Sequence, residues 1–264
     1  MKKLKIFPLK VVIVSLLAAM IFNFQAVIAQ EENDAISVYQ YRKVEQAKMN
    51  DFIERETKYW SKVAQKAVDE GKLQFWGLFQ KVGGYDLENS SNVLFINTFS
   101  DIDDTDGIWD ASAVFPDVPM EDLETSSMST VTSMIFVKSQ YWREKDGVNP
   151  PEDFKYLQMV YHNAENPSGL IAAEEEIWAP FIKSAMDNGI TQQKGWGNAI
   201  ILSPTGEEIK YNTISYDLYS SLKEALNPSW DQDTEFPDMT KIGETEGNRR
   251  ASVVYQIVHV VNAN

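Results

Sequence analysis

One unusual line occurs twice in this chain. "WDASAVFPD" occupies residues 109–117 and "WDQDTEFPD" occupies residues 230–238, so the pattern W-D-x4-F-P-D recurs 121 residues apart in a sequence of 264 residues. An internal repeat constrains a fold strongly, because both copies are expected to form the same structural unit. A longer repeat is therefore expected around these two segments.

A longer repeat is found when the sequence is displaced by 118 residues. Residues 36–71 then align with residues 154–189 without a gap. The identical pairs are Gln40–Gln158, Ile53–Ile171, Glu56–Glu174, Trp60–Trp178, Ala67–Ala185, Asp69–Asp187 and Gly71–Gly189.

Further matches follow in the same order in both halves. Trp76-Gly77 corresponds to Trp196-Gly197, and "INTFSD" (96–101) corresponds to "YNTISYD" (211–217). The doubled W-D-x4-F-P-D comes next, and each half then ends on an apolar run that is typical of a strand. Because chance would not preserve this order, we infer a tandem duplication.

Each half has the pattern of a β-α-β-β-α-β unit. Runs rich in β-branched and aromatic residues predict strands, and apolar residues at helical spacing predict one long helix that ends at Gly71 or Gly189. A helical or irregular stretch is expected between the third and fourth strands, where the unit has its second helix. The expected strands are 36–44, 74–82, 92–100 and 131–142, then 154–162, 193–202, 208–216 and 251–261, and the expected long helices are 50–70 and 168–188.

This order of elements is the ferredoxin-like one. Such a unit leaves one apolar face of its sheet uncovered, so two fused units can close a barrel. With the strand "VYQYRKV" (38–44) and the E-x3-W spacing of Glu56 and Trp60, the chain resembles the dimeric α/β-barrel superfamily, which includes antibiotic-biosynthesis monooxygenases, EthD-like and NIPSNAP-like proteins. The resemblance implies an α+β fold: two tandem ferredoxin-like repeats that form a single-chain pseudo-dimeric α/β barrel. It transfers no catalytic residue, because no catalytic motif of these families is recognisable.

The beginning of the sequence has the layout of a secretory signal peptide. Four lysines precede a run of 12 apolar or small residues, 11–22, which is too short for a membrane-spanning helix, and a cleavage site is expected after Ala29. We therefore expect an exported protein, periplasmic or extracellular. The expected organisation is a signal peptide (1–29), a first repeat (30–142), a linker (143–153) and a second repeat (154–264).

Composition excludes several classes of partner. The chain has no cysteine, hence no disulfide, and a net charge of −15. Without the four lysines of the signal peptide the charge is −19, which disfavours nucleic acid and anionic lipid surfaces. No later segment is long and apolar enough to insert stably into a membrane after signal cleavage. The sequence predicts no cofactor and leaves the oligomeric state open.

Glu56 and Glu174 are the candidate catalytic residues. Each carboxylate lies in the apolar stripe of the long helix, four residues before a tryptophan. A buried glutamate must be paired or protonated. It could act as an acid–base or ligand-anchoring group in a pocket between helix and sheet. Alternatively, it could only fix the helix by hydrogen bonds to strand residues such as Gln40, Gln158 or Arg42.

Trp60 and Trp178, with Gln40 and Gln158, are the candidate ligand-binding residues, because an aromatic ring beside a buried carboxylate suits an amphipathic molecule. The simpler interpretation of these tryptophans is core packing.

Metal chemistry finds little support in the sequence. His162 and His259 show no metal-ligand spacing, and "DIDDTDG" (101–107) does not match a calcium-binding loop, so no metal site is predicted.

Three functions stay open at this point. The first is the binding of a small amphipathic or apolar molecule in helix–sheet pockets. The second is a cofactor-independent monooxygenase or isomerase, and the third is a structural or interaction protein without a ligand. The fold does not choose among them, because related folds have unrelated functions.

Overall fold

The computed structural model describes residues 35–83, 90–206 and 210–262. The expected signal peptide, 1–29, lies outside these residues. Within the described parts of the chain, no helix has both the length and the apolar character needed to cross a bilayer. The strands are β1 (Ile36–Val44), β2 (Leu73–Lys81), β3 (Val93–Phe99), β4 (Ser129–Glu144), β5 (Tyr156–Asn163), β6 (Gly195–Ser203), β7 (Thr213–Tyr219) and β8 (Asn248–Asn262).

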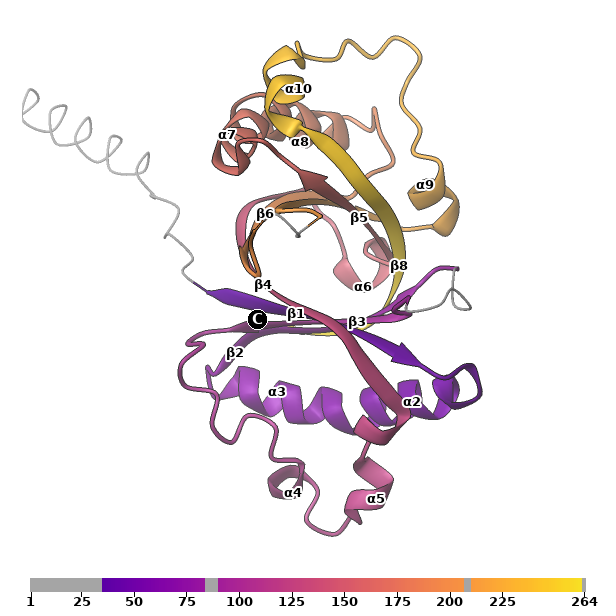
Figure 1. Ribbon diagram of the computed structural model, residues 1–264. Coiled ribbons are helices and arrows are strands. Elements are labelled where there is room, and N and C mark those ends of the chain that lie inside the picture. Colours follow the sequence, from indigo (N-terminus) through magenta and orange to yellow (C-terminus); the bar gives the residue numbers. More distant parts are fainter. Residues whose placement is uncertain (1–34, 84–89, 207–209, 263–264) are drawn as a thin grey trace, which may run out of the picture. The chain divides into compact units, whose positions relative to one another are not determined.

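These eight strands close an antiparallel barrel in the order β1-β3-β2-β8-β5-β7-β6-β4 (Figure 1). The closed barrel predicted from the sequence is confirmed. The first half contributes its strands in the order β4-β1-β3-β2, and the second half repeats this order as β8-β5-β7-β6. The last strand of each half pairs with the other half, β4 with β6 and β8 with β2. The two halves therefore share one barrel, and the described residues from Ala35 onward form one compact unit.

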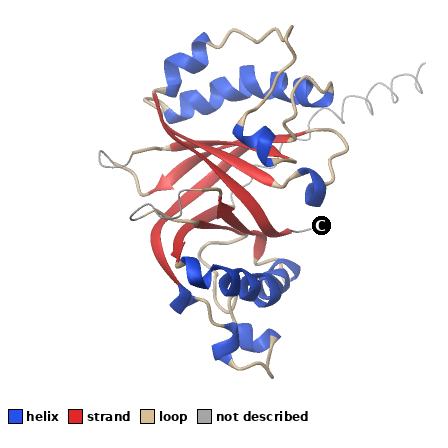
Figure 2. Ribbon diagram, turned by 90° about the vertical axis from the view of Figure 1, so that its right-hand side faces the viewer, coloured by secondary structure: helices blue, strands red, loops and turns tan. Residues whose placement is uncertain are grey.

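Helices lie outside the barrel on two opposite sides (Figure 2). Each expected long helix is present but is interrupted by a π-helical turn of five residues. Gly71 and Gly189 follow these helices with φ of +73° and +71°, a conformation that glycine adopts without strain. The segments are α2 (Met49–Arg55), η2 (Glu56–Trp60) and α3 (Ser61–Asp69), then α7 (Pro167–Ala173), η4 (Glu174–Trp178) and α8 (Ala179–Asp187).

The second helix expected in each half is replaced by short helical segments. These regions bury few apolar side chains, so they lack the apolar stripe that stabilises a longer helix. A short 3-10 turn, η1 (Gln46–Lys48), also precedes α2. The segments are α4 (Ala111–Val114), α5 (Met120–Leu123) and η3 (Ser126–Met128) in the first half, α6 (Pro150–Asp153) in the linker, and α9 (Leu222–Leu226) and α10 (Thr240–Glu246) in the second half.

The strand register corrects the alignment of the two halves. The pairing of β1 with β3 places Tyr41 opposite Leu94, and the pairing of β5 with β7 places Tyr161 opposite Ile214. Both pairs are displaced by 120 residues, and so are the register shifts that follow Tyr41 in β1 and Tyr161 in β5, whereas the gapless alignment uses 118. The strands therefore match Tyr41 with Tyr161, and Gln40 with Val160 rather than with Gln158. The helices keep the 118-residue spacing, because both π-turns begin at the aligned glutamate.

The core has two parts, one inside the barrel and one beneath the helices. Side chains alternate between these two parts along each strand. Trp76 and Trp196 are buried on the helix side, so core packing accounts for both. The interior cluster contains Tyr39, Tyr41, Phe79, Leu94, Ile96, Ile135, Val137, Leu157, Met159, Tyr161, Ala199, Ile201, Ile214, Leu218 and Tyr255.

The two copies of W-D-x4-F-P-D pack on the long helices rather than on the sheet. Phe115 meets Tyr59 edge to face at 5.2 Å, and Phe236 lies 5.5 Å from the ring of Phe181. In the first copy, the first aspartate, Asp110, caps the helix that follows it. In the second copy, the last aspartate, Asp238, accepts a hydrogen bond from Thr240 N at 3.0 Å. These contacts give the motif a structural role at the outer faces of the long helices.

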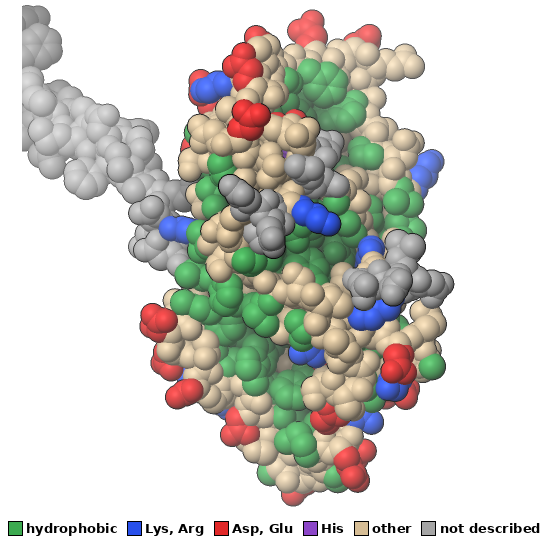
Figure 3. All heavy atoms as spheres, in the orientation of Figure 1, with side chains coloured by type: hydrophobic (Ala, Val, Ile, Leu, Met, Phe, Trp, Pro, Cys, Tyr) green, Lys and Arg blue, Asp and Glu red, His purple; other side chains and the backbone are tan. Residues whose placement is uncertain are grey.

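The acidic balance of the sequence is visible on the surface. In Figure 3, Asp and Glu side chains are spread over the upper and lower parts of one face, with hydrophobic side chains between them. Several lysines are engaged in ion pairs within or between helical segments, such as Lys66 with Glu70 at 2.6 Å. Exposed pairs of this kind contribute little to stability.

Candidate functional site

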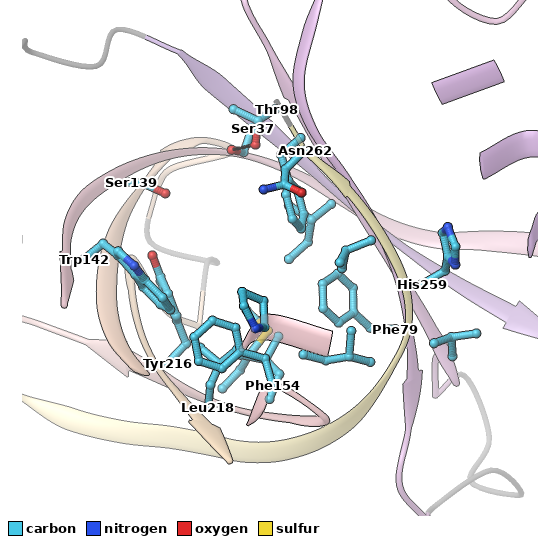
Figure 4. A pocket seen from close by; sticks show the side chains of 18 of the residues that line it. Ser37, Phe79, Thr98, Ser139, Trp142, Phe154, Tyr216, Leu218, His259 and Asn262 are labelled. Carbon is cyan, nitrogen blue, oxygen red and sulfur yellow. Dashed lines mark hydrogen bonds between the residues drawn. The ribbon is translucent and has the colours of Figure 1, made fainter. Parts of the chain in front are cut away.

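The barrel contains a cavity of about 690 Å³ that is partly open to solvent. This volume is in the range of sites that bind small organic molecules. Its wall is formed by strands of both halves and by the linker, and most of the lining is apolar (Figure 4). The lining residues are Ser37, Tyr39, Phe75, Phe79, Ile96, Thr98, Ser139, Trp142, Glu144, Pro150, Phe154, Lys155, Leu157, Met159, Tyr216, Leu218, Ile257, Val258, His259, Val260 and Asn262.

Two inward-facing glycines make room for the aromatic rings of this wall. A Cβ atom on Gly77 would lie 2.5 Å from the ring of Phe79, and one on Gly197 would lie 2.5 Å from the ring of Tyr216. These distances are too short for any real side chain. The doubled Trp-Gly pair thus has two functions: its tryptophan fills the core under the helix, and its glycine admits an aromatic ring on the cavity side.

One side of the cavity is an aromatic wall. The rings of Trp142 and Tyr216 are stacked, with centroids 6.0 Å apart and planes inclined by 23°. Phe154 meets Trp142 edge to face at 5.9 Å. Trp142 and Tyr216 lie side by side in Figure 4. Such a wall suits contact with a flat apolar or aromatic molecule.

The linker closes part of the cavity. Pro150 begins α6, and Phe154 follows it directly; both contribute to the lining. The structure thus assigns to the linker a role at the site that its charged, proline-containing sequence did not indicate.

Polar groups in the cavity are few and mostly uncharged. The hydroxyl groups of Ser37 and Thr98 are hydrogen-bonded to each other at 2.8 Å. Ser139 is hydrogen-bonded to the hydroxyl of Tyr216, although burial still raises the pKa of that tyrosine. Burial likewise raises the pKa of Tyr39, which is 4% exposed, so its phenol stays protonated at neutral pH.

Charged or titratable residues contribute only at the edge of the lining. Glu144 accepts a hydrogen bond from Trp142 Nε1 at 3.1 Å, and Lys155 is exposed. His259 contributes to the lining, but its ring is directed away from the other labelled side chains in Figure 4 and lies 6.2 Å from the ring of Trp76 beneath the helix. Its pKa is lowered by burial. The cavity therefore suits an uncharged molecule.

Glu56 is the first residue of the π-turn η2, and its side chain is buried outside the barrel interior. Its Oε1 accepts a hydrogen bond from Thr125 Oγ1 at 2.6 Å. Burial raises the pKa of Glu56 to about 7, against the opposing effects of the Thr125 hydroxyl and the positive charge of Arg42. Arg42 in turn donates to Gln40 Oε1 at 2.6 Å and to Ser129 Oγ at 3.1 Å.

Glu174 occupies the same place in η4 but has different partners. Asn198 Nδ2 donates to its Oε2 at 2.7 Å, and Ser215 Oγ donates to its Oε1 at 3.0 Å. Asn198 and Ser215 lie opposite each other on β6 and β7. This arrangement ties the helix to the barrel wall.

The remaining candidate residues lie apart from the cavity. Trp60 Nε1 donates to the carbonyl of Leu123 at 2.8 Å, and Trp178 contacts Phe181 and Trp230. Gln158 donates to Ser252 Oγ at 3.2 Å. Neither the two glutamates nor Trp60, Trp178, Gln40 or Gln158 lines the cavity described above. Their roles in catalysis or binding stay predictions.

The cavity residues lie on the face of each strand opposite to the one that carries Gln40 and meets the long helices. The alternation in "VYQYRKV" contained the relevant signal, since Tyr39 and Tyr41 share the face opposite to Gln40. Aromatic residues at period two on one face would have indicated an aromatic barrel interior.

The two histidines do not come together. His162 is buried on β5, with Nδ1 3.1 Å from Glu246 Oε1, whereas His259 packs near Trp76. Across the described ranges, no three His, Cys, Asp or Glu side chains are grouped in a way that could hold a metal ion.

Comparison with known proteins defines the fold class. No family model and no curated protein matches the sequence. An anthrone oxidase-like protein has a similar structure, with a TM-score of 0.50 and 14% identity over 88% of this chain and 94% of that chain. A heme-binding protein from Thermus thermophilus gives 0.46 and 9% over 84% and 90%, and a mutant chlorite dismutase from Candidatus Nitrospira defluvii gives 0.47 and 9% over 86% and 91%.

The class that follows is an α+β protein with a closed eight-stranded antiparallel barrel, a fold similar to that of the anthrone oxidase-like protein. The barrel implied by the resemblance noted in the sequence is confirmed. The individual families named there stay predictions, because identities of this size show the fold alone.

Proposed function

We propose that this protein binds a small, largely apolar molecule inside its barrel. The observation that carries the proposal is the cavity of about 690 Å³ between the two halves, with its stacked wall of Trp142 and Tyr216 and its few uncharged polar groups. The site differs from the helix–sheet pockets expected from the sequence. Burial of a flat apolar molecule against aromatic rings supplies affinity, at roughly 25 cal/mol per Å² removed from water.

Native mass spectrometry of the protein purified from its own source tests this proposal. We expect a retained small molecule that is lost in Ser139→Trp, because Ser139 lines the cavity and a large side chain would fill it. Glu56→Gln is the matched control, since Glu56 lies outside the cavity, and it should keep the molecule. Retention by Ser139→Trp together with loss from Glu56→Gln would instead favour a helix–sheet pocket.

The second candidate is a cofactor-independent monooxygenase that acts on a molecule held in the same cavity. Its support is the name of the anthrone oxidase-like protein with a similar fold. Consumption of dioxygen when the retained molecule is added, without added metal or flavin, would support an enzyme. Absence of consumption, with binding intact, would leave a binding protein.

We also propose that the chain arose by tandem duplication and that the protein is exported. Two tandem ferredoxin-like repeats are supported by the repeated strand order and by a π-turn at the aligned glutamate of each half. The repeats are expected at 30–142 and 154–264, with residues 143–153 as linker.

Export by a signal peptide at 1–29, to the periplasm or the exterior, is tested by sequencing the N-terminus of the protein recovered from those fractions. Recovery of an intact N-terminus in the cytoplasm would overturn it.

A further inference from the structure

Tyr39 stands out among the tyrosines of the barrel interior. Its side chain is 4% exposed and lines the cavity. Its hydroxyl makes no hydrogen bond with any residue of the described chain, although Tyr216 is close enough to influence it electrostatically. This hydroxyl is not among the polar atoms of the described residues that are shut off from solvent without a partner, so it reaches the cavity, where a ligand atom can bond to it.

Tyr41, two residues further along β1, shows the contrast. Its hydroxyl lies 3.0 Å from the hydroxyl of Tyr161, so these two matched residues of the two halves bond to each other inside the barrel. Tyr161 is also hydrogen-bonded to Tyr255. Neither Tyr41 nor Tyr161 lines the cavity. The interior therefore contains one set of tyrosines that bond to one another, and two tyrosines, Tyr39 and Tyr216, that line the cavity. Of these two, Tyr216 is hydrogen-bonded to Ser139, whereas Tyr39 has no hydrogen-bond partner among the described residues.

The surroundings of Tyr39 decide what it can bind. Most interior side chains around it are apolar or aromatic, among them Ile96, Phe79 and Met159. The polar pair Ser37 and Thr98, two residues away along β1 and β3, is uncharged and hydrogen-bonded to itself. Burial keeps the phenol protonated, so Tyr39 acts as a hydrogen-bond donor rather than as an anion. An ionised group placed here would lose its hydration without gaining a counter-charge, because the cavity's charged residues lie at its edge. An uncharged acceptor loses far less.

We propose that Tyr39 donates a hydrogen bond to an uncharged carbonyl oxygen of the bound molecule, so that the cavity selects flat aromatic carbonyl compounds over both hydrocarbons and carboxylates. The proposal rests on the proposed binding function and adds the chemical class of the ligand. The aromatic wall of Trp142 and Tyr216 would contact the flat body, and Tyr39 would fix its orientation.

Two isosteric probes test this assignment by isothermal titration calorimetry. The probe 2-acetonaphthone carries a carbonyl group, and 2-isopropenylnaphthalene carries a CH₂ group in place of the oxygen. A hydrogen bond of about 0.5–1.5 kcal/mol corresponds to a preference of roughly 2- to 12-fold for the ketone. Tyr39→Phe should reduce this preference to about 1 while it still binds both probes. Tyr41→Phe, which removes a hydroxyl bonded elsewhere, is the matched control and should retain the preference.

The outcomes separate the two proposals. If wild-type protein binds neither probe, the proposed binding function fails. If it binds both equally, or if Tyr39→Phe keeps the preference, the role of Tyr39 is wrong while the cavity remains a binding site. Binding of 2-naphthoate as tightly as the ketone would overturn the selection against carboxylates.

Discussion

The two buried glutamates occupy the same position in the two halves but have different surroundings. Glu174 is held by Asn198 and Ser215, which lie opposite each other on β6 and β7. The residues at the matching positions of β2 and β3 are Leu78 and Phe95, which also lie opposite each other. The barrel wall beneath Glu56 therefore offers no side-chain donor at these two positions.

Glu56 finds its partners elsewhere as a result. It accepts from Thr125, just before β4, and lies in the field of Arg42. Two further residues of the same helix hold the segment before β4. Arg55 donates to the carbonyl of Glu124, and Trp60 donates to the carbonyl of Leu123. In the second half, Glu174 thus fixes the long helix to the sheet. In the first half, Glu56 fixes the segment before β4 to the long helix. A repeated buried carboxylate therefore need not mark a repeated active site.

The largest effect is expected from making the second half resemble the first. Asn198→Leu removes a donor from the buried Glu174 and an acceptor from Tyr141 N. We expect the free energy of unfolding to fall by about 4 kcal/mol, because the buried carboxylate loses its amide donor and gains no other in its place. Urea denaturation measures this change.

The double variant Glu174→Leu/Asn198→Leu provides the control for that prediction. Because replacing both partners of a buried pair by apolar groups removes the poorly compensated carboxylate, it should recover at least half of the loss. A double variant less stable than Asn198→Leu would show that the carboxylate has another essential role.

The pH dependence of stability distinguishes Glu56. Its pKa is raised from an ordinary 4.5 to about 7, so the folded protein binds this proton more tightly than the unfolded chain does. The stabilisation is complete below about pH 4.5 and is lost as the pH rises through about 7. At about 1.4 kcal/mol per pH unit, the loss is about 3 kcal/mol.

Glu56→Gln cannot ionise and should lack this loss between pH 4.5 and 7.5 in chemical denaturation series. The exposed neighbour Glu54 gives the matched control, and Glu54→Gln should keep the wild-type dependence. Parallel curves for Glu56→Gln and wild type would place the pKa of Glu56 near its ordinary value.

Substitution of the two inward-facing glycines should change stability by more similar amounts than substitution of the two buried glutamates. Gly197→Ala forces a methyl group against the ring of Tyr216, and Gly77→Ala forces one against Phe79. Overpacking of this kind costs about 2 kcal/mol, measurable by urea denaturation, and should also weaken binding of a flat probe in the cavity.

Gly243→Ala in α10 is the control for these variants, because a Cβ there meets no atom within 4 Å, and it should be neutral or slightly stabilising. If Gly197→Ala bound the probe as tightly as wild type, the aromatic wall would not contact the ligand.

The smallest effects are expected at the outer faces of the long helices. Phe115 and Phe236 hold the doubled W-D-x4-F-P-D segments there, and Phe236 is 51% exposed. We expect Phe115→Ala to cost about 2 kcal/mol and Phe236→Ala about 1 kcal/mol, because the first ring is less exposed. Thermal unfolding checks the order; the reverse order would indicate that the cluster of Phe181 and Trp230 depends on Phe236.

The sequence predicted the parts of this fold that depend on local pattern. Strand positions, the long helices and their terminal glycines follow from periodicity and from glycine's access to positive φ. Two features could not be predicted in this way. The strands of the two halves match at a displacement of 120 residues and the long helices at 118, so the segments between strand and helix differ in length by two residues. The π-turns could not be predicted either, because they leave no mark on the identity of the aligned residues.

The candidate site was harder to predict because it is built from both halves and the linker. Tyr39 comes from β1, Tyr216 from β7 and Phe154 from the segment between the repeats, and only barrel closure brings them together. Burial of Glu56 and Glu174 was predicted correctly. Their partners Thr125, Asn198 and Ser215 were not, because no local pattern indicates which distant donor reaches a buried carboxylate.

The position of the ligand is the central claim, and methionine methyl NMR tests it most directly. Met159 lines the barrel cavity, whereas Met49 and Met186 lie beneath the long helices of the first and second half. On titration with 2-acetonaphthone, we predict that the methyl resonance of Met159 shifts while those of Met49 and Met186 stay unchanged. Shifts at Met49 or Met186 with Met159 unchanged would contradict the account and place the ligand between helix and sheet.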